Sequence, residues 1–429
     1  MQPAPSIGLS LRALALPTFA LALGISVLTT YAPLLLGEAT SSAGAIGIAV
    51  GAEGAFALFL PLLIGSLSDR TRSRLGRRIP YALVGVPLLV VPLVILPFAH
   101  GYAETVALVS LFFVGYHIYY PPYQALFAEL VPLSHQGRSQ GWQGVMRGLG
   151  LGVALVAGGL LLSVWTPLPF LLAAVAAVLA TVVLVREVRG KERPVPVASP
   201  EAPRGPGVLR LVRERADVRA FVAANALWEL SFMGLKTFIV LFVVKGLGES
   251  VGTASAVMGV VAGAYVVAAF GAGRVADAVG IHRLMRVAIW VYGVGLLVGA
   301  GLSTLDSFLI GLPIIALAGA VVMTLPYGIL AGMTPAGAEG ALSGLFGFSR
   351  ALGAVLGPIV VGVAIDVLAP VFPATNGYGA MWVAIGTPIL LSLPFLNALR
   401  SEEPEAEPEL PLRRAEPAVA ALDELALAA

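Results

Sequence analysis

The feature that most constrains this chain is a succession of long apolar runs that extends over nearly its whole length. A helix needs about 20 predominantly apolar residues to cross the hydrocarbon core of a bilayer. Twelve runs meet this requirement, and they lie near residues 13–36, 43–67, 79–99, 104–131, 141–164, 167–186, 219–245, 252–273, 284–303, 306–331, 341–367 and 377–399. The sequence therefore predicts an all-α integral membrane protein with twelve transmembrane helices.

Composition excludes the main alternatives. Only 12% of the 429 residues are charged, whereas a soluble domain carries roughly 25%. This deficit excludes a soluble enzyme, a nucleic-acid-binding protein and a disordered chain. Cysteine is absent and the 4 histidines are scattered, so no spacing typical of a metal site is present. We expect no enzyme activity, no metal and no cofactor.

Basic residues are concentrated in alternate connections between the runs. The connection after the second run carries Arg70, Arg72, Arg74, Arg77 and Arg78. The connections after the sixth and eighth runs are also basic, whereas the intervening ones are almost free of Lys and Arg. By the positive-inside rule the basic connections are cytoplasmic, and so are both termini. The chain is expected to reside in the cell membrane as a monomer.

Two changes in composition divide the chain. A polar, proline-rich segment at 187–218 separates a six-helix bundle over 1–186 from a second over 219–399. The acidic, proline-rich residues 400–429 predict a disordered cytoplasmic tail. The sequence thus predicts two bundles, a linker and a tail.

The two predicted bundles repeat each other. Pro122-Tyr123 followed by Arg147 recurs as Pro326-Tyr327 followed by Arg350. The pattern of Gly65 and Asp69 recurs as Gly273 and Asp277. Because both bundles begin on the same side, the repeat is parallel, and its axis runs along the membrane normal. Such bundles are pseudo-symmetric and hold a solute site between them near the bilayer midplane.

Two segments carry a family resemblance. The stretch GSLSDRTRSRLGRR resembles the signature between spans 2 and 3 of the major facilitator superfamily; its matching residues are Gly65, Asp69, Arg70, Gly76, Arg77 and Arg78. The spacing within it, and the stretch PYQALFAELVP from Pro122 to Pro132, resemble the glycoside–cation symporters (melibiose carriers) and the sucrose transporters. The resemblance implies the major facilitator fold and secondary active transport of a small polar solute by alternating access.

Most of the residues that bind cation and sugar in the melibiose carriers are replaced at the matching positions of this chain. The two acidic cation ligands of the melibiose carriers fall on Ala57 and Pro61, and their sugar-binding acid falls on Tyr120, whereas their arginine on span 5 is kept as Arg147. A sodium site is therefore not expected, and a proton is the expected coupling ion. The subgroup implies a sugar or glycoside as cargo. The alternative is a carrier or exporter of an anionic or amphiphilic solute, such as an organic anion or a drug.

Ionisable side chains within spans are costly and mark candidate functional positions. Glu53 and Glu229 are candidates for proton coupling. Arg147 and Arg350 occupy matching places on spans 5 and 11, where they bind the solute or form structural ion pairs. Glu229 and Lys236 are seven positions apart, so both lie on one face of their helix. Three roles are open for Lys236. It contacts the solute, it joins Glu229 in an ion pair with Glu53 across the two bundles, or its ammonium extends outward to the membrane surface.

Uncharged side chains complete the candidate sites. Asn225 lies on the polar face of span 7, and Tyr119 and Tyr120 belong to an aromatic stripe on span 4 that either lines the cavity or packs. At the cytoplasmic edge, Asp69 is expected to face the N-terminus of span 11 and nearby arginines. Glu129 is expected to form an inner gate with the Arg70–Arg78 cluster, and Asp277 is the counterpart of Asp69 in the second bundle.

Overall fold

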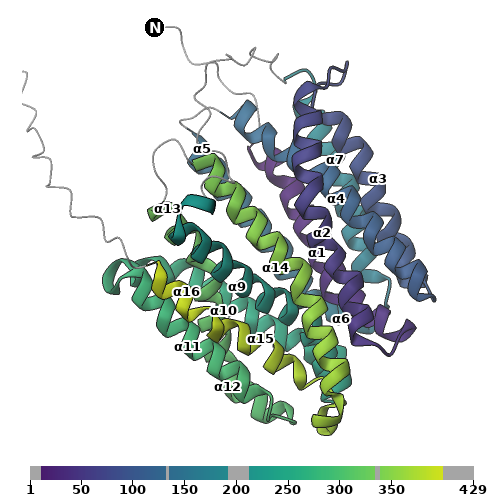
Figure 1. Ribbon diagram of the computed structural model, residues 1–429. Helices are drawn as coiled ribbons and strands as arrows, with labels where there is room; N and C mark the ends of the chain where they lie inside the picture. The colour runs from purple at the N-terminus through teal and green to yellow at the C-terminus, as the bar shows by residue number, and fades with distance from the viewer. Residues whose placement is uncertain (1–10, 132–134, 192–211, 334–338, 400–429) are drawn as a thin grey trace, which may run out of the picture.

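A computed structural model describes residues 11–131, 135–191, 212–333 and 339–399. The expected tail and most of the expected linker lie outside these residues. The described chain is built of helices, and it contains no strand within those four ranges. We call α1–α7 the N-terminal half and α9–α16 the C-terminal half (Figure 1).

The N-terminal half supplies six membrane-crossing units, two of them made of more than one piece. They are α1 (Leu11–Ala39), α2 (Ala43–Arg70), α3 (Ile79–Ile95) with η1 (Leu96–Phe98), α4 (Tyr102–Leu130), α5 (Gln136–Gly152) with η3 (Val153–Ala157) and α6 (Gly158–Val164), and α7 (Leu168–Val188).

The C-terminal half supplies six more. They are α9 (Ala216–Leu241) with η4 (Phe242–Gly246), α10 (Val251–Val279), α11 (Ile281–Gly299), α12 (Leu305–Thr324) with α13 (Pro326–Gly332), α14 (Glu339–Leu368), and α15 (Ala380–Leu391) with α16 (Leu393–Ala398); η5 (Ala369–Val371) and η6 (Pro373–Thr375) lie between α14 and α15.

Eleven of these twelve units are long and apolar enough to cross a membrane on length and composition alone. The twelfth is α4, which has 29 residues. Its tyrosines and the pair Pro121-Pro122 make it less apolar than the others. The predicted number and order of spans therefore hold for the fold.

Several spans are interrupted where the sequence showed only continuous apolar runs. The segments η3 and η4 are π-helical turns, an insertion that is frequent at functional sites. Pro326 begins α13 immediately after Leu325, as expected for a residue that cannot donate the i→i−4 hydrogen bond.

The internal repeat also appears in how the second helix of each half begins. The hydroxyl oxygen of Ser42 accepts a hydrogen bond from the backbone N–H of Ala45 at 3.1 Å. In the C-terminal half the hydroxyl of Ser250 does the same for the N–H of Thr253 at 3.0 Å. A serine N-cap satisfies an otherwise unpaired backbone donor, so both helices start by the same device.

The two halves meet mainly along α2 and α14, which lie side by side through the middle of the molecule (Figure 1). Glycines make this close approach possible. A Cβ at Gly47 would lie 2.1 Å from the carbonyl oxygen of Pro358, and one at Gly362 would lie 2.3 Å from that of Ala43. Small residues of this kind let membrane helices pack backbone to backbone. Further contacts join α1 to α9, and α10 to η3 and α6.

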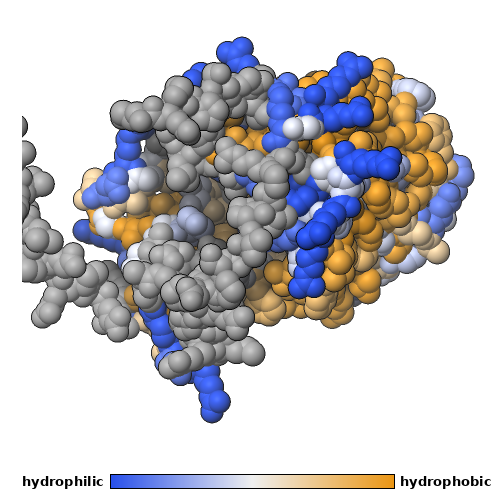
Figure 2. Space-filling model, turned by 90° about the horizontal axis from the view of Figure 1, so that it is seen from above, coloured by the Kyte–Doolittle hydropathy of each residue, from blue (hydrophilic) through white to orange (hydrophobic). Residues whose placement is uncertain are grey.

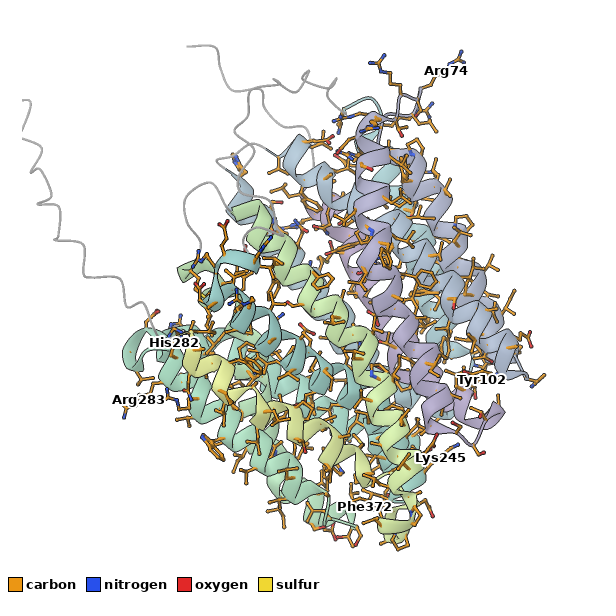
Figure 3. The ribbon with its side chains drawn as sticks, viewed as in Figure 1. Arg74, Tyr102, Lys245, His282, Arg283 and Phe372 are labelled. Atoms are coloured by element: carbon orange, nitrogen blue, oxygen red, sulfur yellow. The ribbon has the colours of Figure 1, made fainter. Side chains whose placement is uncertain are left out.

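These contacts are concentrated at one end of the molecule. A side chain at Gly65, near the end of α2 that precedes Arg70, would meet no described atom within 4 Å, and the same holds at Gly148 of α5 and Gly347 of α14. In Figure 3, Arg74, in the connection between α2 and α3, and Arg283, in the first turn of α11, lie far apart. We call this side, which carries the Arg70–Arg78 connection, the basic end, and the other the closed end.

The outer surface fits a bilayer. Apolar side chains such as Ile310, Leu62 and Val164 are about four-fifths exposed, at 81%, 78% and 78%. Seen from the basic end, Figure 2 shows hydrophilic side chains gathered on top of the N-terminal half and a hydrophobic flank beside them. The apolar flank is the surface suited to contact lipid, and the hydrophilic top is the surface suited to face water.

Candidate functional site

A cluster of charged side chains lies where the closed part of the interface gives way to the open part. Glu53 comes from α2, Glu229 and Lys236 come from α9, and Arg350 comes from α14. Their charges act on one another. Both halves therefore contribute to one electrostatic unit.

Two glycines bring the three helices of this cluster together. A Cβ at Gly54 would lie 2.4 Å from the backbone nitrogen of Val355 on α14. A Cβ at Gly353 would lie 2.5 Å from the Cβ of Glu229 on α9. The helix α14 is thus held against α2 on one side and α9 on the other, at the level of the charges.

Glu229 and Arg350 form an ion pair that sequence analysis did not anticipate. Nε of Arg350 lies 3.1 Å from Oε1 of Glu229. The glutamate side chain is 5% exposed, whereas that of the arginine is 56% exposed. The second oxygen, Oε2, is buried and has no hydrogen-bond partner among the described residues. One acceptor thus remains open beside an exposed guanidinium.

Lys236 and Glu53 are left without such partners. Lys236 is half-buried and forms no ion pair or hydrogen bond with the described residues; the nearest opposing charges are those of Glu53 and Glu229. Glu53 is also half-buried, and within the described ranges its carboxylate has no ion pair. The ammonium of Lys236 belongs to the C-terminal half and the carboxylate of Glu53 to the N-terminal half. A molecule bound between them therefore contacts both halves.

The N-terminal half contributes an arginine and two stacked tyrosines. Nη2 of Arg147 on α5 donates a hydrogen bond to the hydroxyl of Tyr120 on α4 at 3.2 Å. The rings of Tyr116 and Tyr120 are stacked, with centroids 5.3 Å apart and an interplanar angle of 12°. Tyr116 lies within reach of the charges of Glu53, Arg147 and Arg350. We call Glu53, Tyr116, Tyr120, Arg147, Glu229, Lys236 and Arg350 the central cluster.

Two predicted cavity residues do not join the central cluster. Tyr119 is 1% exposed, and its hydroxyl hydrogen-bonds that of Thr181 on α7 at 3.0 Å. Asn225 is also 1% exposed and donates from Nδ2 to Ser349 on α14 at 2.8 Å. Tyr119 therefore packs inside the N-terminal half instead of lining a cavity. Asn225 lies inside the C-terminal half, where it links α9 to α14.

The signature residues at the basic end form a network within the N-terminal half. Nη2 of Arg78 lies 2.6 Å from Oε1 of Glu129 and 2.6 Å from Oδ1 of Asp69. Arg77 lies 3.0 Å from the same Glu129 oxygen. Burial lowers the pKa of Arg78, but hydrogen bonds and charge from Glu129, and then from Asp69, outweigh it and raise the pKa above the ordinary value. The guanidinium thus holds the ends of α2 and α4 together.

The expectation for Asp69 holds in part. Asp69 pairs with a nearby arginine, Arg78 across the connection, whereas no hydrogen bond joins it to the described residues at the start of α14. The cause is that the halves are apart at the basic end. Gly76 supplies the positive φ of 101° that the connection needs. Arg70 and Asp277 are exposed, and neither forms an ion pair within the described ranges.

The closed end contains charged contacts that sequence analysis missed. The carboxylate of Asp366 on α14 accepts hydrogen bonds from the hydroxyl of Ser42 at 2.7 Å and from the N–H groups of Ala43 and Gly44 at 2.8 and 2.9 Å. These donors are at the N-terminus of α2, whose dipole favours a negative charge. The sequence signal was Ser42 as an N-cap, but nothing in it placed Asp366 nearby.

Lys245 forms a complementary contact at the same end. Its Nζ donates to the carbonyl oxygen of Gly37, near the C-terminus of α1, at 2.5 Å. A cation at a helix C-terminus is favoured for the same electrostatic reason. Lys245 was visible in the sequence as a lone basic residue in an otherwise neutral type of connection. Figure 3 shows Lys245 and Tyr102 at this end, and the hydroxyl of Tyr102 bonds the carbonyl of Ala45 at 2.8 Å.

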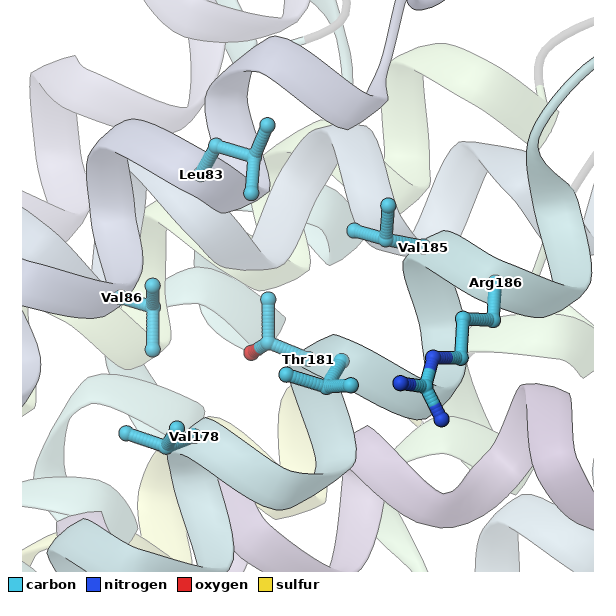
Figure 4. A pocket seen from close by; sticks show the side chains of 7 residues that line it. Leu83, Val86, Val178, Thr181, Val185 and Arg186 are labelled. Atoms are coloured by element: carbon cyan, nitrogen blue, oxygen red, sulfur yellow. The ribbon is translucent and has the colours of Figure 1, made fainter.

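A separate crevice lies away from these charges, between α3 and α7 (Figure 4). It has a volume of about 260 Å³ and is lined by Leu83, Val86 and other aliphatic side chains, with Thr181 and Arg186 as polar members. Its apolar walls offer little to hold a polar solute. Among the described residues, no group of three or more His, Cys, Asp or Glu is placed to hold a metal ion.

Comparison with known families decides the classification. The family model of the Major Facilitator Superfamily matches residues 14–358, with a second match over 229–427. The chain belongs to the major facilitator superfamily. No curated protein matches the sequence significantly.

Solved major facilitator structures share the fold. A bacterial homolog of the human lysosomal transporter Spinster, in an inward-facing and unoccupied conformation, superposes with a TM-score of 0.74 at 16% identity, covering 91% of this chain and 96% of that one. The nucleoside transporter NupG gives a TM-score of 0.72 at 15% identity, covering 92% and 100%. At such identities the likeness concerns the fold, so the cargo must be argued from the site.

Proposed function

We propose that this major facilitator protein moves a small polar solute across the cell membrane by alternating access, in symport with protons. The observation that carries the proposal is the position of the central cluster. It draws charged side chains from both halves, and it lies where the packed part of the interface ends at Gly54. A solute bound there would change access when the halves rock about it.

The proposal assigns the open end to the cytoplasm. The Arg70–Arg78 connection is the most basic one, and the positive-inside rule places it inside the cell together with both termini. The conformation is then inward-facing, which is also how the Spinster homolog is described. The two bundles move as the rocking units, and the protein acts as a monomer.

Glu53 is the proposed coupling residue. Within the described residues its carboxylate has no ion pair, whereas Glu229 is held by Arg350. A carboxylate binds a proton more readily when it loses contact with water. Closing the basic end would remove water from Glu53, so its protonation accompanies the transition. Glu229 is instead expected to contact the solute through Oε2, the oxygen that has no hydrogen-bond partner among the described residues.

Two classes of cargo remain under this proposal. The subgroup resemblance and the stacked rings of Tyr116 and Tyr120 support a sugar or glycoside, because sugars stack on aromatic faces. The three cations of the central cluster support an organic anion. Both are small polar solutes, and both fit a proton symporter.

Transport in proteoliposomes tests the coupling. A thermal-shift screen of sugars, organic anions and drugs first identifies a solute, because a ligand of the native state raises the melting temperature. Glu53→Gln is expected to abolish uphill accumulation driven by a proton gradient and to preserve downhill counterflow. Glu229→Gln is expected to weaken affinity. Full accumulation by Glu53→Gln, or uptake that follows sodium at fixed pH, would overturn proton coupling at Glu53.

A further inference from the structure

The charges of the central cluster do not balance. Glu229 and Arg350 neutralise each other at 3.1 Å. Arg147 and Lys236 then remain against the single carboxylate of Glu53. The cluster therefore holds three basic side chains against two carboxylates, a formal excess of one positive charge. Water is displaced when the basic end closes, and an uncompensated charge in a low-dielectric setting is costly.

Lys236 is the cation that most needs a partner. An ammonium has three donors and no acceptor, and among the described residues nothing accepts from it. It lies about 30 Å along α9 from Ala216 at 1.5 Å per residue, deeper than either arginine. Its surroundings include Arg350, a like charge that opposes its own. A negatively charged group on a bound molecule would neutralise the Lys236 ammonium and accept its hydrogen bonds.

Arg147 offers a second contact from the other half. Of its five N–H donors, the structure shows one engaged, by the neutral hydroxyl of Tyr120. It is exposed and lies about 16 Å along α5 from Gln136. Arg350 lies the same distance, about 16 Å, along α14 from Glu339. A solute entering from the basic end thus meets the arginines first and Lys236 farther in.

We propose that the solute is an organic anion whose carboxylate, or a group of the same charge, binds Lys236 and Arg147. Its carbon skeleton lies against the stacked rings of Tyr116 and Tyr120, which lie beside Arg147. This inference rests on the proposed function and names its cargo class. Because the two cations belong to different halves, the anion draws the halves together. A neutral molecule of the same shape leaves both cations unpaired, so it binds more weakly.

Matched sets of ligands test the charge directly. The purified full chain is titrated with glucuronate, glucose and glucosamine, with benzoate, benzamide and benzylamine, and with lactate and lactamide. In at least one set the carboxylate is expected to bind about tenfold or more tightly than its neutral analogue. Equal or tighter binding of the neutral or cationic member in every set, or no binding by any carboxylate, overturns the assignment.

Variants locate the binding group. Lys236→Gln and Arg147→Gln are each expected to reduce the preference for the carboxylate to about one, and Lys236→Arg to restore most of it. Arg186→Gln is the matched control, because Arg186 lies at the crevice between α3 and α7. Melting temperatures without ligand show that each variant is folded. A preference that survives both Lys236→Gln and Arg147→Gln contradicts the proposal.

The outcome is separable from that of the proposed function. If the halves alternate and Glu53→Gln uncouples transport, but glucose binds as well as glucuronate, only the anion assignment fails. If the halves do not alternate, the transport proposal fails whatever the ligand preference.

Discussion

The two ends of the interface between the halves hold charges in different ways. At the closed end, Asp366 and Lys245 reach from the C-terminal half to helix termini of the N-terminal half. At the basic end, Arg78 forms ion pairs with Asp69 and Glu129, which belong to its own N-terminal half. The first arrangement ties the halves together, whereas the second braces one half by itself.

The difference lies in what each charge must give up when the halves separate. Asp366 would lose three donors, two of them backbone N–H groups at the start of α2. Arg78 would keep its ion pairs with Asp69 and Glu129, since both partners belong to the same half and move with it. We therefore expect the electrostatics of the closed end to select the conformation, and changes there to matter more than changes in the signature connection.

The largest effect is expected where backbone meets backbone. Gly47→Leu places a side chain where even a Cβ would lie 2.1 Å from the Pro358 carbonyl, so the halves cannot pack as they do. Overpacking of this kind costs about 1–3 kcal/mol or more, and the melting temperature in detergent should fall. Gly65→Leu is the control, because that position is open. Equal melting temperatures for the two variants would contradict the close approach of α2 and α14.

Asp366→Asn should shift the conformational equilibrium next most strongly. The amide keeps the shape but loses the negative charge at the N-terminus of α2, and hydrogen bonds to a charged group contribute about 1.5–3 kcal/mol. The fraction of molecules open at the closed end should rise roughly tenfold or more. Labelling of a cysteine introduced near Ser42 measures this opening, and Asp306→Asn, an exposed acid in the first turn of α12, is the control. Unchanged labelling would remove Asp366 from the gate.

Lys245→Met should act in the same direction with a smaller effect. Lys245 bonds to one neutral carbonyl, that of Gly37, whereas Asp366 accepts from three donors. A charge at a helix end contributes about 0.3–1 kcal/mol. The same labelling assay applies. An effect larger than that of Asp366→Asn would show that the α1 terminus, not the α2 terminus, controls opening.

Asp69→Asn should have the smallest effect on the conformation described here. The Asp69 side chain is 62% exposed, and Arg78 keeps Glu129 as a partner. Exposed ion pairs contribute about 0–1 kcal/mol. Cysteine probes on both sides of the protein should therefore change little. A large shift toward either state would show that Asp69 also engages α14 in the opposite conformation.

Local sequence patterns were enough for the fold. Apolar runs gave the spans, and the repeat of Pro122-Tyr123 and Arg147 in Pro326-Tyr327 and Arg350 gave the two-bundle plan. The breaks at η3 and η4 were not predicted, since π-turns have no distinct composition.

The site was predictable residue by residue but not pair by pair. Sequence reasoning selected Glu229 and Arg350 separately; that they meet depends on Gly353, which lets α14 approach α9. It also selected Tyr119 and Tyr120 together, and helix rotation sends one to Thr181 and the other to Arg147. Asp366 was missed because its partners are backbone N–H groups, which no side-chain pattern reveals.

Spin-label distances across both ends of the interface test the central claim most directly. The chain contains no cysteine, so pairs can be introduced into the unmodified sequence: Arg74→Cys with Arg283→Cys at the basic end, and His100→Cys with Ser303→Cys at the closed end. When the carboxylate identified by titration binds in proteoliposomes, the first distance should shorten and the second lengthen in the same molecules. Two distances that change independently, or that both stay fixed as ligand saturates, would contradict alternating access about the central cluster.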